Sequence, residues 1–174
     1  MNITLALTVG VPIAILIYIV KSDRFPEPTN LVIQTFFVGV FICVPAGYLN
    51  SYIYLLEGAL GIKDMSFLAG FTEEPLKFLA FMLFIKAKSD FDEPMDAIVY
   101  GAAIGLVYAA IENVGYLNYG DLETAWTLSI VKVRYIPLIM HLGFGVIMGW
   151  LLSLNLFEER SAFKRRVMLI LSLA

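Results

Sequence analysis

Long apolar runs separated by short polar loops are the dominant pattern of this chain. Each run is long enough to cross about 30 Å of hydrocarbon as an α-helix. The complete runs are Ile3–Val20, Leu31–Leu56, Met65–Ile85, Met95–Leu117 and Tyr135–Phe157. The pattern therefore predicts an all-α fold, a polytopic integral membrane helix bundle with five complete transmembrane helices.

A further apolar run begins at Val167 and reaches Ala174, the last residue, which makes it too short to span a bilayer. We expect the sequence to be cut inside a sixth helix, and residues 1–174 to form a single transmembrane domain. Composition agrees with this class, because the chain is 60% hydrophobic and only 16% charged, with a mean hydropathy of +0.82. Its single cysteine, Cys43, excludes an internal disulfide and a cysteine-type metal site.

The distribution of basic residues predicts the orientation. The first run is not a cleavable signal peptide, since its basic residues follow the apolar stretch instead of preceding it. Loops after the first, third and fifth runs hold eight Lys and Arg residues, against three in the other loops. The positive-inside rule then places the N-terminus outside. The eight are Lys21, Arg24, Lys86, Lys88, Arg160, Lys164, Arg165 and Arg166; the three are Lys63, Lys132 and Arg134.

One apolar run contains a charged group, formed by Glu73, Glu74 and Lys77. In a bilayer each charge costs about 2.5–3.5 kcal/mol on insertion scales. On a helix the lysine lies three and four positions from the acids and reaches both. Pro75 predicts a bend or a fresh helix start there, with Thr72 as a plausible N-cap. The group is either a self-neutralised packing device or a functional site.

Two other helices carry ionisable groups on faces of small residues. Glu112, followed by Asn113, continues a glycine and alanine face, and His141, the only histidine, begins another. An unpaired glutamate on a packing face requires a cation or a shared proton. A third small-residue face precedes Asn50, which we expect to satisfy a neighbouring backbone group. The faces are Gly101, Gly105 and Ala109; Gly145 and Gly149; and Gly39, Cys43 and Gly47.

The depths of these groups coincide. With the N-terminus outside and a rise of 1.5 Å per residue, Glu73, Glu112 and His141 all lie roughly 8–12 Å below the outer boundary. A shared hydrated cavity open to the outer side accounts for this alignment. The outer loop between them, residues 118–134, has an amphipathic pattern that predicts a helix on the membrane surface.

Such a cavity permits only limited chemistry. No Gly-x-Ser-x-Gly motif is present, and no cysteine adjoins the histidine. A carboxylate can act as general base on water, and adjacent acids with separated pKa values can divide the roles of acid and base. His141 could donate to an oxyanion or orient the water. The alternative is a single Zn²⁺ held by Glu73 or Glu74, Glu112 and His141, so the identity of any metal ligand stays unknown at this stage.

At these residues the chain resembles the PrsW family of bacterial intramembrane proteases, which is distantly similar to the CAAX prenyl protease and bacteriocin-processing superfamily. The resemblance rests on Glu-Glu-x-x-Lys at residues 73–77, aromatic-x-x-x-Glu-Asn at residues 108–113 and His141 in a glycine-rich helix. Supporting segments are Pro26-Glu27-Pro28 and residues 91–101. The family usually has Phe where this chain has Tyr108, and another His in a last helix beyond the end of this sequence.

The resemblance implies a multi-pass peptidase of the bacterial plasma membrane that cleaves a single-pass membrane protein, typically an anti-sigma factor in a stress response, near the extracytoplasmic face. It makes Glu73, Glu74, Glu112 and His141 the catalytic residues, with Lys77 and Asn113 supporting them. We expect no cofactor and no nucleic-acid partner, with the zinc site as the alternative. A non-enzymatic transporter or scaffold is the competing class; the chain shows no internal repeat of the kind transporters use.

Overall fold

The computed structural model describes residues 3–62, 66–118, 128–159 and 161–173. Within these residues all regular structure is helical, which confirms the predicted all-α membrane bundle. The elements are α1 (Ile3–Ser22), α2 (Thr29–Leu60), the 3₁₀ turn η1 (Ser66–Leu68), α3 (Ala69–Ala80), the π-helical η2 (Phe81–Ile85), α4 (Pro94–Asn118), α5 (Leu128–Leu156) and α6 (Ala162–Leu171).

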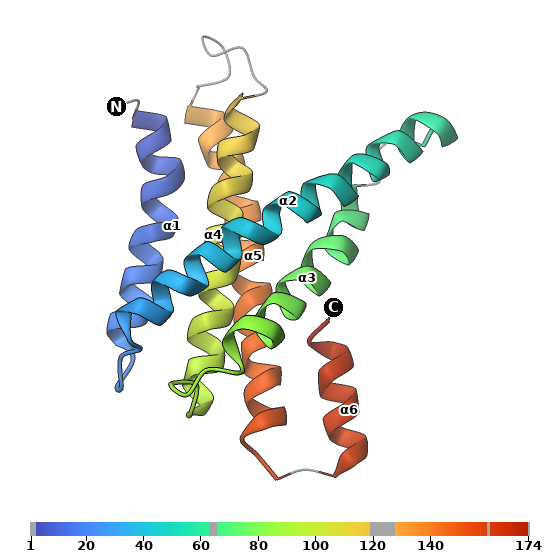
Figure 1. The fold of residues 1–174 in the computed structure, drawn as a ribbon. Coiled ribbons are helices and arrows are strands. Elements are labelled where there is room, and N and C mark those ends of the chain that lie inside the picture. The colour runs from blue at the N-terminus through green and yellow to red at the C-terminus, as the bar shows by residue number, and fades with distance from the viewer. Residues whose placement is uncertain (1–2, 63–65, 119–127, 160, 174) are drawn as a thin grey trace.

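Helix α4 is the centre of the bundle. Its apolar window is 78% buried, against 39% for α5 and 28% for α2. Helices α1 and α5 run alongside it, while α2 crosses it obliquely (Figure 1). The far end of α2 and the start of α3 project away from the other helices, and α6 folds back beside α5 (Figure 1). Side chains of α4 therefore meet every neighbour that carries a candidate site residue.

Length and composition allow three of the described helices to cross a bilayer: Thr29–Leu60, Pro94–Tyr116 and Arg134–Leu156. Leu7–Ser22 is a shorter apolar helix. The exposed side of α2 is a stripe of large apolar residues at helical spacing, including Phe37, Phe41, Tyr48 and Tyr52, each at least 63% exposed. Such a surface is stable against lipid and not in water. The N-outside orientation stays a prediction.

Close packing of α4 on α5 depends on the glycine faces identified in the sequence. A Cβ atom on Gly105 would lie 2.2 Å from the carbonyl oxygen of His141, and one on Gly101 would lie 2.3 Å from that of Gly145. Gly149 approaches the carbonyl of Ala97 in the same way. Small residues allow two backbones to approach in a membrane, where no hydrophobic force joins helices. This contact brings His141 against α4.

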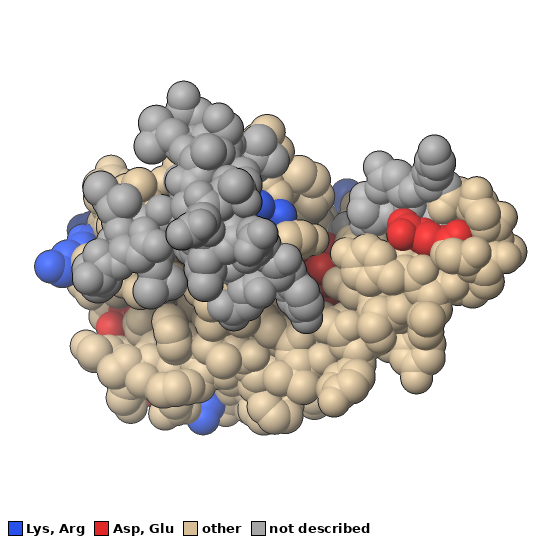
Figure 2. Space-filling view, turned by 90° about the horizontal axis from the view of Figure 1, so that it is seen from above, with Lys and Arg blue, Asp and Glu red and all other residues tan. Residues whose placement is uncertain are grey.

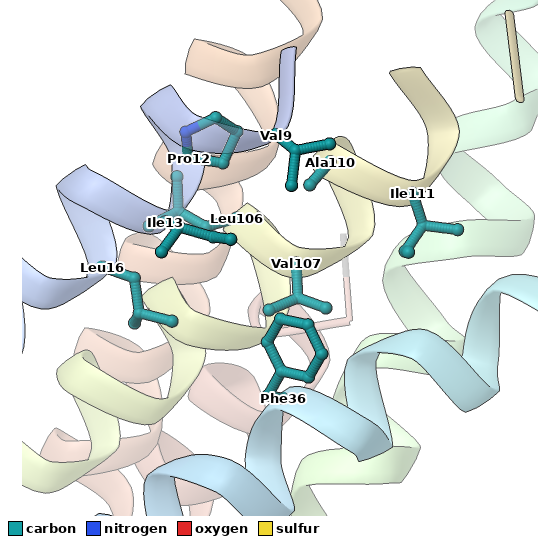
Figure 3. Close-up of a pocket in the computed structure, with 9 residues that line it drawn as sticks. All are labelled: Val9, Pro12, Ile13, Leu16, Phe36, Leu106, Val107, Ala110 and Ile111. Atoms are coloured by element: carbon teal, nitrogen blue, oxygen red, sulfur yellow. The ribbon is translucent and has the colours of Figure 1, made fainter. Parts of the chain in front are cut away.

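Helix α1 packs on the other side of α4 through apolar side chains. A small cavity of about 40 Å³ remains between α1, α2 and α4, lined only by apolar residues, and Figure 3 shows their side chains around it. Leu16, Leu106 and Val107 of its lining belong to a buried cluster. A cavity of this kind stays dry, so we assign it to packing.

Several predicted boundaries were wrong. Thr72 is not an N-cap, because α3 begins at Ala69 and continues through Pro75; the irregular turn is instead η2, where the Lys86 amide bonds to the carbonyl of Phe81. Helix α5 begins at Leu128, seven residues before the predicted run. Residues 128–134 of the predicted surface helix therefore belong to α5 and do not form a separate helix. The rest of that prediction, residues 119–127, lies outside the described part of the chain. Helix α6 begins at Ala162, before the predicted Val167.

We predict that Gly105→Ala destabilises the protein, because its methyl group would collide with the backbone of α5. Overpacking of this kind costs about 1–3 kcal/mol, so the melting temperature in detergent should fall by roughly 3–10 °C. Gly143→Ala is the matched control on α5, since nothing lies within 4 Å of a Cβ placed there. Equal melting temperatures for the two variants would contradict the close α4–α5 contact.

Candidate functional site

The structure brings Glu73, Glu74, Glu112 and His141 together around the imidazole ring. His141 Nε2 lies 3.3 Å from Glu112 Oε2 and 3.9 Å from Glu73 Oε2, and His141 Nδ1 lies 3.8 Å from Glu74 Oε1. These groups come from α3, α4 and α5. The prediction that Glu73, Glu112 and His141 lie at one level of the bundle is confirmed. The role of each residue is a proposal.

Lys77 is the most buried member of the group, with a fully inaccessible side chain. Its Nζ lies 2.6 Å from Glu74 Oε1 and 2.8 Å from His141 Nδ1. It also lies 4.2 Å from the centre of the Tyr108 ring, close enough for a cation–π contact. The ammonium therefore joins α3 to α5 and has three partners in place of water.

This contact determines the tautomer of His141. An ammonium group has three donors and no acceptor, so Nδ1 must accept its hydrogen bond. A neutral imidazole that accepts at Nδ1 carries its proton on Nε2. The Nε2–H group then points toward the carboxylates of Glu112 and Glu73. His141 is thereby arranged as a hydrogen-bond donor on the side of the ring opposite Lys77.

Glu73 is held by the side chain of Asn50 on α2. Asn50 Nδ2 donates to Glu73 Oε1 over 2.8 Å, and the hydroxyl of Thr72 lies 2.5 Å from Asn50 Oδ1, which orients the amide. We had expected Asn50 to bond to a backbone group, and that expectation was wrong. One oxygen of Glu73 is thus fixed, while the other, Oε2, faces His141.

Glu112 forms an ion pair with Arg134. Arg134 on α5 donates from Nη2 to Glu112 Oε2 over 2.7 Å and from Nε to Asn113 Oδ1 over 2.7 Å. Its guanidinium also stacks over Tyr116 at 3.9 Å. The site therefore holds three carboxylates against two fixed positive charges, those of Lys77 and Arg134.

A cavity of about 570 Å³ opens beside these groups. Glu73 and Glu112 line it, whereas Glu74 and Lys77 do not. Viewed from above, Figure 2 shows a recess with acidic atoms between the projecting α2–α3 end and the rest of the surface. The remaining lining residues come from α2 and α4: Cys43, Gly47, Asn50, Ser51, Tyr54, Tyr108, Ile111, Gly115 and Tyr116.

The residues fit a metal ion poorly. Glu73, Glu74 and His141 offer ligand atoms within 4.8 Å of one another, which is the spacing of a metal site. However, Lys77 occupies both Glu74 Oε1 and His141 Nδ1, and the resulting tautomer leaves a proton, not a lone pair, on Nε2. A dication would also meet the ammonium of Lys77 beside it. A metal ion bound by His141 would therefore require Lys77 to move away from the imidazole.

Sequence reasoning missed Arg134 and gave Asn50 too small a role. Arg134 was counted in an outer loop because the fifth run was taken to begin at Tyr135. Its distance of seven positions from His141 is the signal that could have identified it, since residues seven apart share a helix face. Asn50 offered no such signal, because its partner Glu73 lies 23 residues away on another helix.

Comparison with known proteins identifies the family. Residues 27–174 match the family described as PrsW family intramembrane metalloprotease. The chain is 36% identical over 157 residues to "Protease PrsW" of Bacillus subtilis, covering 89% of this chain and 68% of that protein. It is 31% identical over 141 residues to the protein of that name in Geobacillus kaustophilus, covering 79% and 60%, respectively.

A third protein named "Protease PrsW", from Oceanobacillus iheyensis, is 30% identical over 145 residues, which cover 81% of this chain and 64% of that protein. The chain thus spans about two thirds of the length of these curated relatives. No solved structure matches it significantly. The family match over most of the chain, together with these relatives, shows that the protein belongs to the PrsW family of membrane peptidases.

Proposed function

We propose that this protein hydrolyses a peptide bond of a single-pass membrane protein inside the bilayer, with a water molecule activated by a glutamate. The observation that carries the proposal is the position of Glu73. Its carboxylate lines a cavity of about 570 Å³, and its Oε2 lies 3.9 Å from His141 Nε2. A carboxylate base thus borders the cavity, with the imidazole of His141 behind it.

Glu73, rather than Glu74, is the general base in this proposal. Glu74 is bonded to Lys77 and does not line the cavity, so no substrate water reaches it without displacing the ammonium. Glu73 accepts from Asn50 at Oε1, and its Oε2 lies on the side of His141. Glu74 instead positions Lys77, and Lys77 positions the imidazole.

The reaction follows from these positions. Glu73 removes a proton from water while the water oxygen attacks the scissile carbonyl carbon, and the carbonyl oxygen becomes an oxyanion. His141 Nε2–H donates to that oxyanion, where charge develops. Glu73 then gives its proton to the leaving amine as the C–N bond breaks, which yields a carboxylic acid and an amine. Arg134 pairs with Glu112 beside the imidazole.

The substrate class is part of the proposal. The cavity lies between α2, α3 and α4, and α2 also presents an exposed apolar stripe to lipid, so we propose that a membrane-embedded segment reaches the cavity from the bilayer. We propose that this segment belongs to a single-pass protein, an anti-sigma factor by resemblance, cut near the extracytoplasmic face of the bacterial plasma membrane. The N-outside orientation puts the site in the outer leaflet.

The family description favours a second candidate, a metal-dependent peptidase. Glu73, Glu112 and His141 would hold a zinc ion only after Lys77 released His141 Nδ1. Such an ion would lower the pKa of a bound water and supply hydroxide. Our proposal derives no step from it, because Lys77 occupies His141 Nδ1 in this arrangement.

We predict that Glu73→Gln abolishes cleavage of a co-expressed single-pass substrate while the protein still folds. Loss of the general base removes about 10²–10⁴-fold in rate, which leaves no detectable product on an immunoblot. The amide keeps the size of the side chain, so the melting temperature should stay near that of the wild type. Glu159→Gln, an exposed change outside the site, serves as control. Undiminished cleavage by Glu73→Gln would overturn the proposal and favour a scaffold.

We predict that Glu74→Gln destabilises the protein more than the double variant Glu74→Gln with Lys77→Met. The single change leaves a buried ammonium without its carboxylate, which costs about 3–5 kcal/mol. The double variant removes both charges and should recover most of the melting temperature, but without activity, because His141 loses its orienting donor. If the double variant recovered full activity, Lys77 would have no role in positioning His141.

Chelation separates the two candidates. We predict that purified protein dialysed against EDTA retains its cleavage rate and carries less than one zinc per chain in elemental analysis. Stoichiometric zinc that is lost in Glu112→Ala, together with activity restored only by added zinc, would instead establish the metal-dependent candidate.

A further inference from the structure

Four carboxylates gather at the other end of α4, where the loop after α1 meets the loop before α4. Asp23 and Glu27 belong to the first loop, Glu93 and Asp96 to the second loop and the first turn of α4. Oxygens of Asp23, Glu93 and Asp96 lie within 4.8 Å of one another. Asp96 is completely buried, and Asp23 and Glu27 are each 7% exposed. Asp96 and Glu112 are about 24 Å apart along α4, so this cluster is separate from the proposed active site.

The bonding of these acids is incomplete. Asp96 Oδ2 accepts hydrogen bonds of 2.8 Å from the backbone amides of Asp92 and Glu93, but the buried Asp96 Oδ1 has no partner. Asp23 Oδ1 accepts from the amide of Phe25, while the buried Asp23 Oδ2 also has none. Buried acceptors without partners are uncommon and costly. Asp23 and Asp96, two of the three converging carboxylates, each contain one such oxygen without a hydrogen-bond partner.

The cluster also lacks a counter-charge. Within the described residues, no lysine or arginine forms an ion pair with Asp23, Glu27, Glu93 or Asp96. Tyr100, fully buried, donates its hydroxyl to Glu27, which satisfies an oxygen but brings no positive charge. Burying carboxylates without a counter-charge is costly, and a cation between them would offset that cost.

We propose that Asp23, Glu93 and Asp96 bind a hard divalent cation, Ca²⁺ or Mg²⁺, that clamps the loop after α1 to the start of α4. All donors are oxygens, which these ions prefer. Ligands of Ca²⁺ lie 2.3–2.6 Å from the ion and hence within about 5 Å of each other, which agrees with the spacing of at most 4.8 Å here. A cavity of about 600 Å³, lined in part by Glu93 and Asp96, gives the ion an entry and room for water ligands.

The test is a titration of the purified full chain, first dialysed against EDTA, with CaCl₂ and with MgCl₂ at constant ionic strength. At a cation concentration a hundredfold above Kd, binding to the folded state should raise the melting temperature by roughly 5–10 °C in a saturable manner. Asp96→Asn and Asp23→Asn should require at least about tenfold more cation for the same rise. The asparagine at position 96 keeps an acceptor for the two backbone amides.

Two controls make the result specific. Asp90→Asn changes an exposed acid that borders the same cavity but lies outside the three-carboxylate cluster, so it should respond like the wild type. Glu73→Gln should also respond like the wild type, which separates this site from any ion bound near His141. An equal response of Asp96→Asn and wild type would overturn the proposal.

Two further outcomes also decide the question. If neither cation shifts the wild type, and Asp23→Asn without cation melts higher than the wild type, the cluster is neutralised by protons and the proposal is wrong. If the variants fail to fold, equilibrium dialysis of the wild type with radioactive Ca²⁺ and electron paramagnetic resonance with Mn²⁺ take their place. One bound ion per chain supports the site, and none overturns it.

Discussion

The ammonium of Lys77 is the interaction on which the rest of the site depends. It is fully buried, and its hydrogen bonds to Glu74 and His141 connect a helix that carries two acids to the helix that carries the imidazole. Removing either partner would leave a charge in a medium where it cannot be solvated. The same ammonium sets which nitrogen of His141 carries the proton, so one buried charge controls both packing and chemistry.

The lysine can act in this way only because α4 and α5 approach so closely. Gly101, Gly105, Gly145 and Gly149 leave no side chain between the two backbones, and the carbonyl of His141 lies against Gly105. One turn farther along α4, Tyr108 then covers Lys77 and stacks near His141, with ring centres 5.1 Å apart. The glycine contact thus fixes the depth at which the imidazole meets the acids.

The spacing of residues along the sequence could predict some parts of the fold and site and not others. Spacing within one helix identifies a face, so the glycine faces and the common level of Glu112 and His141 were predicted. It does not identify a partner on another helix, so the bond from Asn50 to Glu73 was missed. Arg134 was missed for a different reason: α5 continues seven residues beyond its apolar part toward the N-terminus, because a helix does not have to end where hydrophobicity does.

The charges around His141 explain why the adjacent residues Glu73 and Glu74 have different partners. Three carboxylates face two fixed cations, so one carboxylate has no charge partner. Glu74 is paired with Lys77 and Glu112 with Arg134, which leaves Glu73 outside an ion pair with a lysine or arginine; it accepts from the amide of Asn50 and lies 3.9 Å from His141 Nε2. Of the two adjacent glutamates, the one that borders the cavity is therefore also the one outside an ion pair, so a substrate water can reach its carboxylate without separating Glu74 from Lys77.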